Sequence, residues 1–491
     1  MAGAVTLGLW PLRAAAPSTL YVAFWFDTED YLLPASDDAA KRLAEMFARR
    51  HARATFKVVG EKARVLAARG RTDVIAALAG QTIGFHGNFH SVHPTPAEYS
   101  RDLAWHEGVQ EFLRREGPGF ESVTTVFGVK PACYGQPGSS WTPESYAALR
   151  QWGVPVYLDV TDQVRLRDQP FWYGGVLNVL DLGDAVLRTG WSDAEVARAC
   201  ARFDRLHDRL LAAGGGLVSV FYHPCEFIHQ RFWDAVNFAK GANPPRAAWQ
   251  PPPVKTAAES ERAFHAFETF LDHIIQQPNT KLVTARELPT LYRDGAYARA
   301  WDGDDVRALA RAFQRAVSFA RLGSAGDWVS AEEGLELLAQ AAVSRPSGAT
   351  TPAFHPRFAF GPASRAEQYL RRGQLSGPGL VAAAGEFLAV LRRTGQMPSV
   401  IWVDGQPLRP EDFAATLGAF VERGLADPSS ARPVDLVPGS LAAAQYVADD
   451  SPQLWGWVIF PEGFHAPRLM ELAKLQAWTL KPAALAPVVA R

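Results

Sequence analysis

The chain has few cysteines, and they are not grouped. Its three cysteines, Cys133, Cys200 and Cys225, lie far apart in 491 residues and form no CxxC pair. This spacing argues against a zinc ribbon and against a disulfide framework. The cysteines therefore leave the cellular compartment open.

The chain also lacks charge blocks and long hydrophobic runs. Fifty Lys and Arg residues stand against 51 Asp and Glu residues, for a net charge of −1, so a nucleic-acid partner is not expected. No apolar run reaches the roughly twenty residues that a membrane span needs, which excludes a transmembrane segment. With 48% hydrophobic and 21% charged residues, the composition is globular, and the length predicts two or three domains.

The N-terminus permits two interpretations. Residues 4–12 are apolar and are followed by Arg13, three alanines and Pro17, which resembles a signal-peptide core with a cleavage site that lacks its basic region. The alternative is an irregular arm that packs on the domain. Residues 1–19 are therefore expected to be an N-terminal arm or a signal remnant.

Strand and helix patterns alternate over about 275 residues. Strands are predicted at residues 20–26, 52–60, 82–85, 156–160, 217–222 and 281–284, and helices at 37–50, 73–79 and 287–292. This alternation predicts an α/β fold with a parallel sheet or a β/α barrel, in which polar residues at the carboxyl ends of strands perform chemistry. The residues in such positions are Asp27, His86, His90, Asp159 and His223.

Two polar clusters indicate a metal site. The first strand ends in Asp27, Thr28, Glu29 and Asp30, and about sixty residues later His86, His90 and His93 follow within eight positions. Imidazoles and a carboxylate are the usual ligands of a catalytic divalent metal, and three protein ligands leave a position for water or substrate. The pattern therefore predicts a metal-dependent hydrolase.

Four segments, at residues 26–31, 53–56, 83–90 and 95–99, resemble the polysaccharide deacetylase family, the NodB-homology domain of carbohydrate esterases. The resemblance covers roughly residues 20–295. It implies a distorted β/α barrel, somewhat short of the eight-unit form, that binds a divalent metal. It also implies hydrolysis of N-acetyl or O-acetyl groups on a polysaccharide or peptidoglycan.

The resemblance assigns roles to particular side chains. His86 and His90 are metal ligands, and we expect them on one helical turn, where side chains four apart face the same way. Glu29 is the third ligand, with Asp30 as the alternative, and Asp27 is the general base. The metal expected is zinc, with cobalt or nickel as alternatives.

His223 resembles the late histidine of the family, whose imidazole protonates the leaving group. Asp159 or Asp162 is the candidate carboxylate that orients it. The family arginine that pairs with the catalytic aspartate is absent, because Gly135 or Gln136 stands in its place. Lys130 is the candidate substitute.

The chain changes character after residue 292. It becomes alanine-rich, with helices predicted at 306–320 and 331–343, a linker at 344–362 and a second helical block from 364. Residues 395–413 resemble a pseudomurein-binding repeat, and 327–333 a degenerate first copy. The alternative for this region is a lid or a dimerisation domain.

These observations predict a NodB-like catalytic domain at 20–295 and a helical accessory region at 300–491 with two possible wall-binding repeats. They indicate a metal-dependent polysaccharide deacetylase, expected outside the cytoplasm. Two alternatives stay open. One is a non-catalytic carbohydrate-binding protein that keeps the metal site, and the other is a hydrolase of a non-sugar amide.

Overall fold

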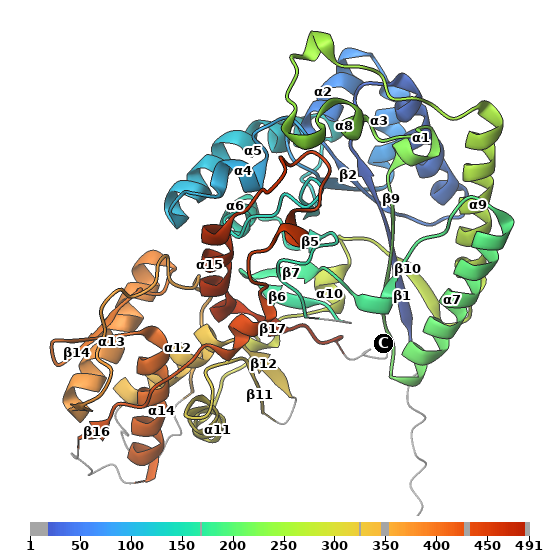
Figure 1. The fold of residues 1–491 in the computed structure, drawn as a ribbon. Helices are drawn as coiled ribbons and strands as arrows, with labels where there is room; N and C mark the ends of the chain where they lie inside the picture. Colours follow the sequence, from blue (N-terminus) through green and yellow to red (C-terminus); the bar gives the residue numbers. More distant parts are fainter. Residues whose placement is uncertain (1–17, 167–168, 324–325, 345–352, 427–432, 487–491) are drawn as a thin grey trace, which may run out of the picture.

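The computed structural model describes residues 18–166, 169–323, 326–344, 353–426 and 433–486. The predicted N-terminal arm or signal remnant lies almost wholly outside these residues. The chain forms a barrel lobe around a large sheet and a smaller helical lobe beside it (Figure 1).

The central strand of the large sheet is β1 (Leu20–Thr28), and its side chains are buried on both faces. It pairs in parallel with β9 (Gly216–Tyr222) along one edge. The other edge is shared, because β10 (Thr280–Val283) pairs with the first half of β1 and β2 (Thr55–Val58) with the second half. A strand covered on both faces is expected to be continuously apolar, as β1 is.

From β2 the sheet continues through further parallel strands and ends in antiparallel ones. The parallel strands are β3 (Thr82–Phe85), β4 (Cys133–Tyr134), β5 (Val156–Leu158) and β7 (Val176–Val179), and β8 (Val186–Leu187) pairs in parallel with β9. The antiparallel strands are β6 (Phe171–Tyr173) and β17 (Lys481–Pro482). The sheet curls into a half-barrel without closing among the described strands, which confirms the predicted distorted β/α barrel.

Helices surround the curled sheet (Figure 1). They are α1 (Pro34–Arg49), α2 (Gly60–Ala68), α3 (Thr72–Ala79), α4 (Pro96–Ser100), α5 (Trp105–Phe127), α6 (Ser145–Trp152), α7 (Asp193–Ala212), α8 (Trp233–Asn237), α9 (Ala257–Gln276) and α10 (Leu288–Leu291). Capping boxes at Ser192 and Thr256 fix the starts of α7 and α9. None of the described helices is both long enough and apolar enough to cross a membrane.

The helical lobe contains the same order of elements twice. The first set is α11 (Gly303–Phe313), β11 (Ala320–Leu322), β12 (Asp327–Val329) and α12 (Ala331–Val343), and the second is α13 (Gly377–Thr394), β14 (Ile401–Val403), β15 (Gln406–Leu408) and α14 (Pro410–Ala426). α11 packs on α14 and α12 on α13, which forms a second hydrophobic core. The helix predicted at 306–320 is too long, because α11 ends at Phe313 and Ala320 already belongs to the β11–β12 hairpin, which was not predicted.

The chain returns to the barrel lobe after the short ladder of β13 (Gln374–Leu375) with β16 (Val434–Asp435). This C-terminal segment, residues 441–485, includes α15 (Pro467–Gln476) and ends at β17 on the edge of the large sheet. Val447, Leu454, Trp455 and Phe460 of the segment belong to the barrel core. In Figure 1 the segment, drawn in red, runs from the helical lobe across the barrel toward α8.

Candidate active site

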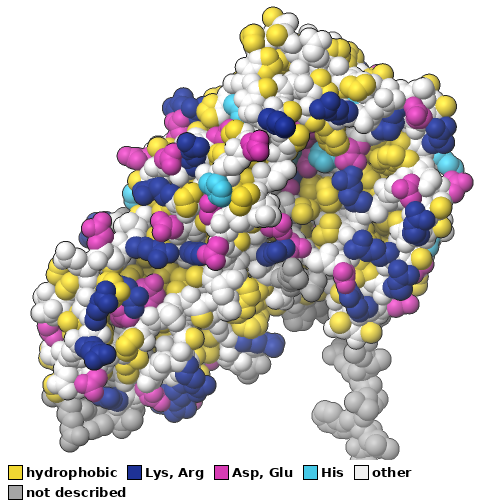
Figure 2. Space-filling view, viewed as in Figure 1, with side chains coloured by type: hydrophobic (Ala, Val, Ile, Leu, Met, Phe, Trp, Pro, Cys, Tyr) yellow, Lys and Arg dark blue, Asp and Glu magenta, His cyan; other side chains and the backbone are white. Residues whose placement is uncertain are grey.

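A cavity of about 590 Å³ opens at the carboxyl ends of the parallel strands. The five polar residues that the sequence places at strand ends, Asp27, His86, His90, Asp159 and His223, all line it. Figure 2 shows a hollow in the barrel lobe with hydrophobic walls and with acidic and histidine side chains among them. The topology therefore gathers the predicted polar residues in one place.

The carboxylates after β1 face two different ways. Asp27 and Glu29 are two positions apart, and both point into the cavity with only 5% and 3% of their surface exposed. Asp30 points away, where its carboxylate lies 3.1 Å from His229 Nε2 and accepts a hydrogen bond from Ser36. The prediction that Asp30 could replace Glu29 as a metal ligand is therefore wrong.

His86 and His90 lie in the loop that follows β3 and not on a helical turn, so the predicted helical geometry is wrong. The loop brings them together in another way, because His90 has a positive φ of 59° that turns the chain back. Their ring centroids are 5.0 Å apart. His93 is turned to Glu98 at 2.8 Å and does not line the cavity.

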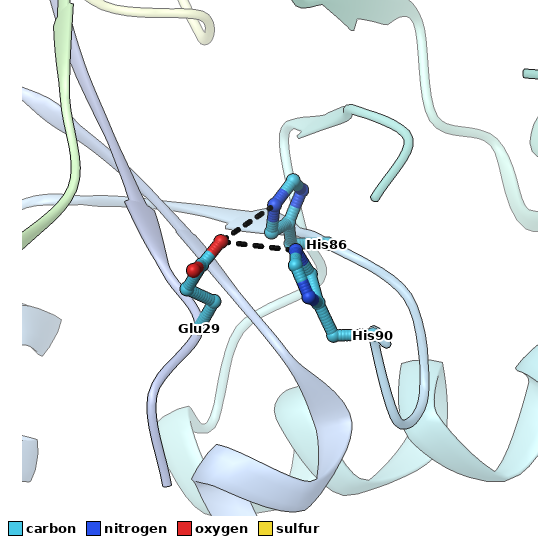
Figure 3. Close-up of side chains that lie close together, drawn as sticks. All are labelled: Glu29, His86 and His90. Carbon is cyan, nitrogen blue, oxygen red and sulfur yellow. Dashed lines mark ion pairs between the residues drawn. The ribbon is translucent and has the colours of Figure 1, made fainter. Parts of the chain in front are cut away.

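Glu29, His86 and His90 form a compact group (Figure 3). Glu29 Oε2 lies 2.9 Å from His90 Nε2 and 3.9 Å from His86 Nε2. The other carboxylate oxygen, Oε1, accepts a hydrogen bond of 3.2 Å from the indole N–H of Trp233. Both Nε2 atoms thus face the same carboxylate.

Burial and neighbouring charges set the protonation of this group. Burial lowers the pKa of His86 to about 3, so its imidazole is neutral at physiological pH. Burial alone would raise the pKa of Glu29, but the nearby imidazoles of His90 and His223 hold it well below its usual value. A neutral imidazole and an ionised carboxylate are the protonation states that metal ligands require.

The contacts of the other ring nitrogens, the Nδ1 atoms, also fit a divalent metal site. The Nδ1 atom of His86 lies 3.0 Å from the carbonyl oxygen of Gly135, and that of His90 lies 2.7 Å from Ser91 Oγ. Such contacts orient a histidine so that Nε2 points at the metal. His90 Nε2 is buried and faces the Glu29 carboxylate at 2.9 Å. Glu29, His86 and His90 could therefore hold the metal.

A second group, Asp27, His86 and Asp159, is also close enough to share a cation. Here the space is taken by Lys57, which is fully buried with its ammonium nitrogen 2.9 Å from Asp27 Oδ1 and 2.6 Å from Asp159 Oδ2. A metal would have to displace a charge that both carboxylates already pair with. This second group is therefore an ion-pair site.

Lys57 supplies the positive charge that was expected beside Asp27 and that the sequence lacks near Gly135. A Cβ atom at Gly135 would clash with the Lys57 ammonium and with Asp159, so the absence of a side chain there makes room for the lysine. The predicted substitute, Lys130, is solvent-exposed outside the cavity, and that prediction is wrong. Burial beside Asp27 raises the pKa of Asp159, although Lys57 opposes this effect.

His223, at the end of β9, reaches the cavity from the side opposite the metal-ligand loop. Its Nε2 atom lies 3.6 Å from Asp27 Oδ2, and its Nδ1 atom lies 2.5 Å from Glu226 Oε1. Glu226 in turn pairs with Arg188. Burial lowers the pKa of His223, but the surrounding carboxylates, Glu29 foremost, raise it to about 9.

The carboxylate that orients His223 is therefore Glu226. The predicted candidates are wrong, because Asp159 pairs with Lys57 and Asp162 is exposed beside Arg165. Glu226 stands only three positions after His223, and the 3₁₀ turn at Pro224–Phe227 folds it back onto the imidazole. The sequence analysis missed Glu226, although a carboxylate only three positions after His223 was a signal that could have identified it.

Sequence reasoning missed three other residues of the site. Lys57 carried a signal, because a lysine in the middle of a buried strand needs a charged partner. Trp233 and Trp457 carried none, since Trp233 begins the short helix α8 and Trp457 lies in the distant C-terminal segment. Both indoles donate to carboxylates at the cavity, Trp233 to Glu29 and Trp457 to Asp234.

Comparison with known proteins gives matches only among solved structures. No family model matches the chain, and no curated protein does. A protein described as a polysaccharide deacetylase from Mycobacterium smegmatis is 15% identical over 59% of this chain and 93% of its own, with a TM-score of 0.37.

Two other solved structures illustrate the range of the matches. A 4-alpha-glucanotransferase from Thermococcus litoralis is 10% identical over 56% of this chain and 41% of its own, with a TM-score of 0.37. A carbohydrate esterase family 4 pseudoenzyme from Bacillus anthracis is 13% identical over 56% of this chain and 66% of its own, with a TM-score of 0.30. At these identities and TM-scores, function has to be inferred from the side chains of the site.

Proposed function

We propose that this chain is a metal-dependent deacylase that hydrolyses an N-acetyl or O-acetyl group on a saccharide. The observation that carries the proposal is the convergence of five ionisable groups on one cavity, four of them buried and the fifth, His223, half-buried. Glu29, His86 and His90 form a ligand set, while Asp27 and His223 approach from two sides with their facing atoms 3.6 Å apart. A site that only bound sugar would need neither a base nor an acid.

Asp27 is the general base. Its carboxylate is buried, is paired with Lys57 on Oδ1, and presents Oδ2 toward the cavity. Burial would raise the pKa of Asp27, but His86 and Lys57 lower it, so the group is ionised and can accept a proton. The Lys57 contact also fixes the carboxylate in place.

The reaction needs one water and two proton transfers. The water oxygen bonds to the acyl carbon as Asp27 takes a proton from it, and the bond from that carbon to the leaving nitrogen or oxygen then breaks. His223, held by Glu226, donates its proton to the leaving atom, which gives acetate and a free amine or alcohol. A bound divalent metal supplies polarisation of the acyl carbonyl.

The test combines metal content with product release. The purified chain is loaded with zinc, cobalt or nickel, the bound metal is measured, and acetate is assayed from acetylated chito-oligosaccharides and from peptidoglycan. His86→Ala and Asp27→Asn are measured beside the wild type. We expect acetate from the wild type alone, with metal lost in His86→Ala and kept in Asp27→Asn.

Other outcomes favour the two alternatives. Stoichiometric metal with sugar binding but no acetate from any glycan would contradict the proposal and favour a carbohydrate-binding protein. Metal without either sugar binding or acetate would favour hydrolysis of a non-sugar amide. An activity that is unchanged in His86→Ala would contradict the assigned ligand set.

We also propose that the helical lobe binds cell-wall material, which places the chain outside the cytoplasm. Support comes from Trp402 in the hairpin of β14 and β15, which is 62% exposed, and from the resemblance of this hairpin to a wall-binding repeat. An exposed indole can stack on a sugar ring. Sedimentation with purified wall material should fall in Trp402→Ala, and equal sedimentation of both proteins would contradict the proposal.

A further inference from the structure

One wall of the cavity comes from a part of the chain about 370 residues beyond the metal-ligand loop. Gly456, Trp457 and Val458 of the C-terminal segment line the cavity together with residues of the barrel strands. Of these three, Trp457 has the largest side chain and is half-buried. The cavity is therefore incomplete without the C-terminal segment.

Trp457 lines the cavity and is held in place by several contacts with the barrel. Its backbone N–H donates to Ser139 Oγ at 3.2 Å, and its indole N–H donates to Asp234 Oδ2 at 2.8 Å. Its ring and the His90 ring are nearly perpendicular, with centroids 5.1 Å apart and an interplanar angle of 81°. A Cβ atom at Gly138 would clash with the indole, so this glycine makes room for it.

The neighbours of Trp457 tie the segment to two loops of the barrel. The carbonyl of Leu454 accepts a hydrogen bond from Gln163 at 2.9 Å. On the other side, the carbonyls of Val458 and Ile459 accept bonds from the backbone N–H groups of Lys240 and Gly241, at 2.9 and 2.7 Å. The segment thus bridges the β4 and β5 side of the site to the loop after β9.

The cavity also has apolar lining residues. Val458 and Val160 line it while 45% and 38% exposed, and Phe221 and Phe232 line it as well. Large apolar side chains left exposed beside a polar cavity mark a place where a ligand covers them. Arg231 is the single Lys or Arg among the described lining residues, which disfavours a negatively charged ligand portion at this place.

We propose that Trp457 is a specificity-determining residue whose indole receives the apolar face of the sugar unit that carries the acyl group. This inference rests on the proposed deacylase function and deepens it. The C-terminal segment then has a role in substrate binding beyond its contribution to the barrel core. A flat ring suits the role, because the C–H face of a pyranose packs on an aromatic face.

The test compares two substitutions of similar bulk. Trp457→Phe keeps a flat ring and loses the bond to Asp234, whereas Trp457→Leu loses both. Trp172→Leu, at a half-buried position in β6 outside the cavity, is the matched tryptophan control. KM and kcat for acetate release from N-acetylchitotriose are measured with each metal-loaded protein. Binding of the same sugar is measured by calorimetry in the Asp27→Asn background, together with metal content.

We expect Trp457→Leu to weaken sugar binding and raise KM about tenfold, with metal content and kcat nearly unchanged. Trp457→Phe should stay within about threefold of the wild type, and Trp172→Leu should equal it. Equal binding in Trp457→Leu and the wild type would overturn the inference, and so would equal losses in the Phe and Leu variants, which indicate a structural anchor.

The calorimetry separates this inference from the proposed function. Sugar binding that weakens in Trp457→Leu, without acetate release by the wild type, supports the binding role and contradicts the deacylase. Acetate release with no effect of Trp457→Leu contradicts the binding role alone. Absence of both sugar binding and acetate release in the wild type contradicts both.

Discussion

The ammonium nitrogen of Lys57 lies 2.9 Å from Asp27 Oδ1, and neither side chain has appreciable contact with solvent. The same nitrogen contacts Asp159 at 2.6 Å and lies 4.2 Å from the ring centroid of Trp25. One lysine therefore pairs with two buried carboxylates. This contact replaces the charge partner that the sequence lacks at Gly135.

Lys57→Met should unfold more easily and lose activity. The substitution leaves two carboxylates buried without a counter-charge, which costs about 3 to 5 kcal/mol of unfolding free energy. Chemical denaturation of the apo protein measures this loss. Adding Asp159→Asn to Lys57→Met removes one of the charges and should restore part of the stability. An unchanged denaturation midpoint in Lys57→Met would show that the pair does not matter.

Gly135→Ala should impair the same contact without touching a charge. The new methyl group would clash with Lys57 and Asp159, and such overpacking costs about 1 to 3 kcal/mol. Gly117→Ala is the matched control, since a Cβ at that position on α5 meets nothing within 4 Å. We expect lower stability and kcat in Gly135→Ala only, and equal behaviour of the two variants would count against the close packing.

Chelation should lower the thermal stability of the wild type, because a ligand that binds only the folded state stabilises it. His90→Ala should show a smaller shift with added metal, since one of three ligands is gone. His265→Ala, on the exposed face of α9, should keep the full shift. Scanning calorimetry with and without zinc makes the comparison, and an equal shift in all three proteins would exclude His90 as a ligand.

Glu226→Gln should reduce kcat about tenfold with little change in KM, because the charge that holds the His223 imidazole is lost while the substrate contacts remain. Asp162→Asn tests the rival carboxylate, which is exposed beside Arg165, and should behave like the wild type. A kcat loss in Asp162→Asn and none in Glu226→Gln would reverse the assignment.

Glu144→Gln should stabilise the protein more at pH 8 than at pH 5. Burial raises the pKa of Glu144 from 4.5 to about 7, so the native state holds a proton that the unfolded state releases. Stability from this group is present below pH 4.5 and is lost as the pH rises to 7. The benefit of Gln should grow by about 2 kcal/mol over that range.

Urea denaturation at several pH values provides the measurement for Glu144. Glu121→Gln, on the exposed side of α5, is the control and should show no dependence on pH. A benefit of Glu144→Gln that is equal at pH 5 and pH 8 would mean that the carboxyl is ionised throughout.

Several elements followed from the sequence because local pattern and tertiary environment agree. The continuous apolar run from residue 20 predicted β1, and the helix predicted at residues 331–343 has the same bounds as α12. The short strands β4 and β8 were not predicted from the sequence. Each has two residues and is defined by its pairing with neighbouring strands. A two-residue strand has no period to detect.

The sequence by itself determined the chemical groups of the site, because strand ends concentrate Asp27, His86 and His223 at one edge of a parallel sheet. It could not determine their partners. Lys57 reaches Asp27 from a neighbouring strand, Glu226 folds back through a 3₁₀ turn, and Trp457 arrives from the far end of the chain. Partners of this kind depend on packing between distant segments, which no local pattern in a single sequence records.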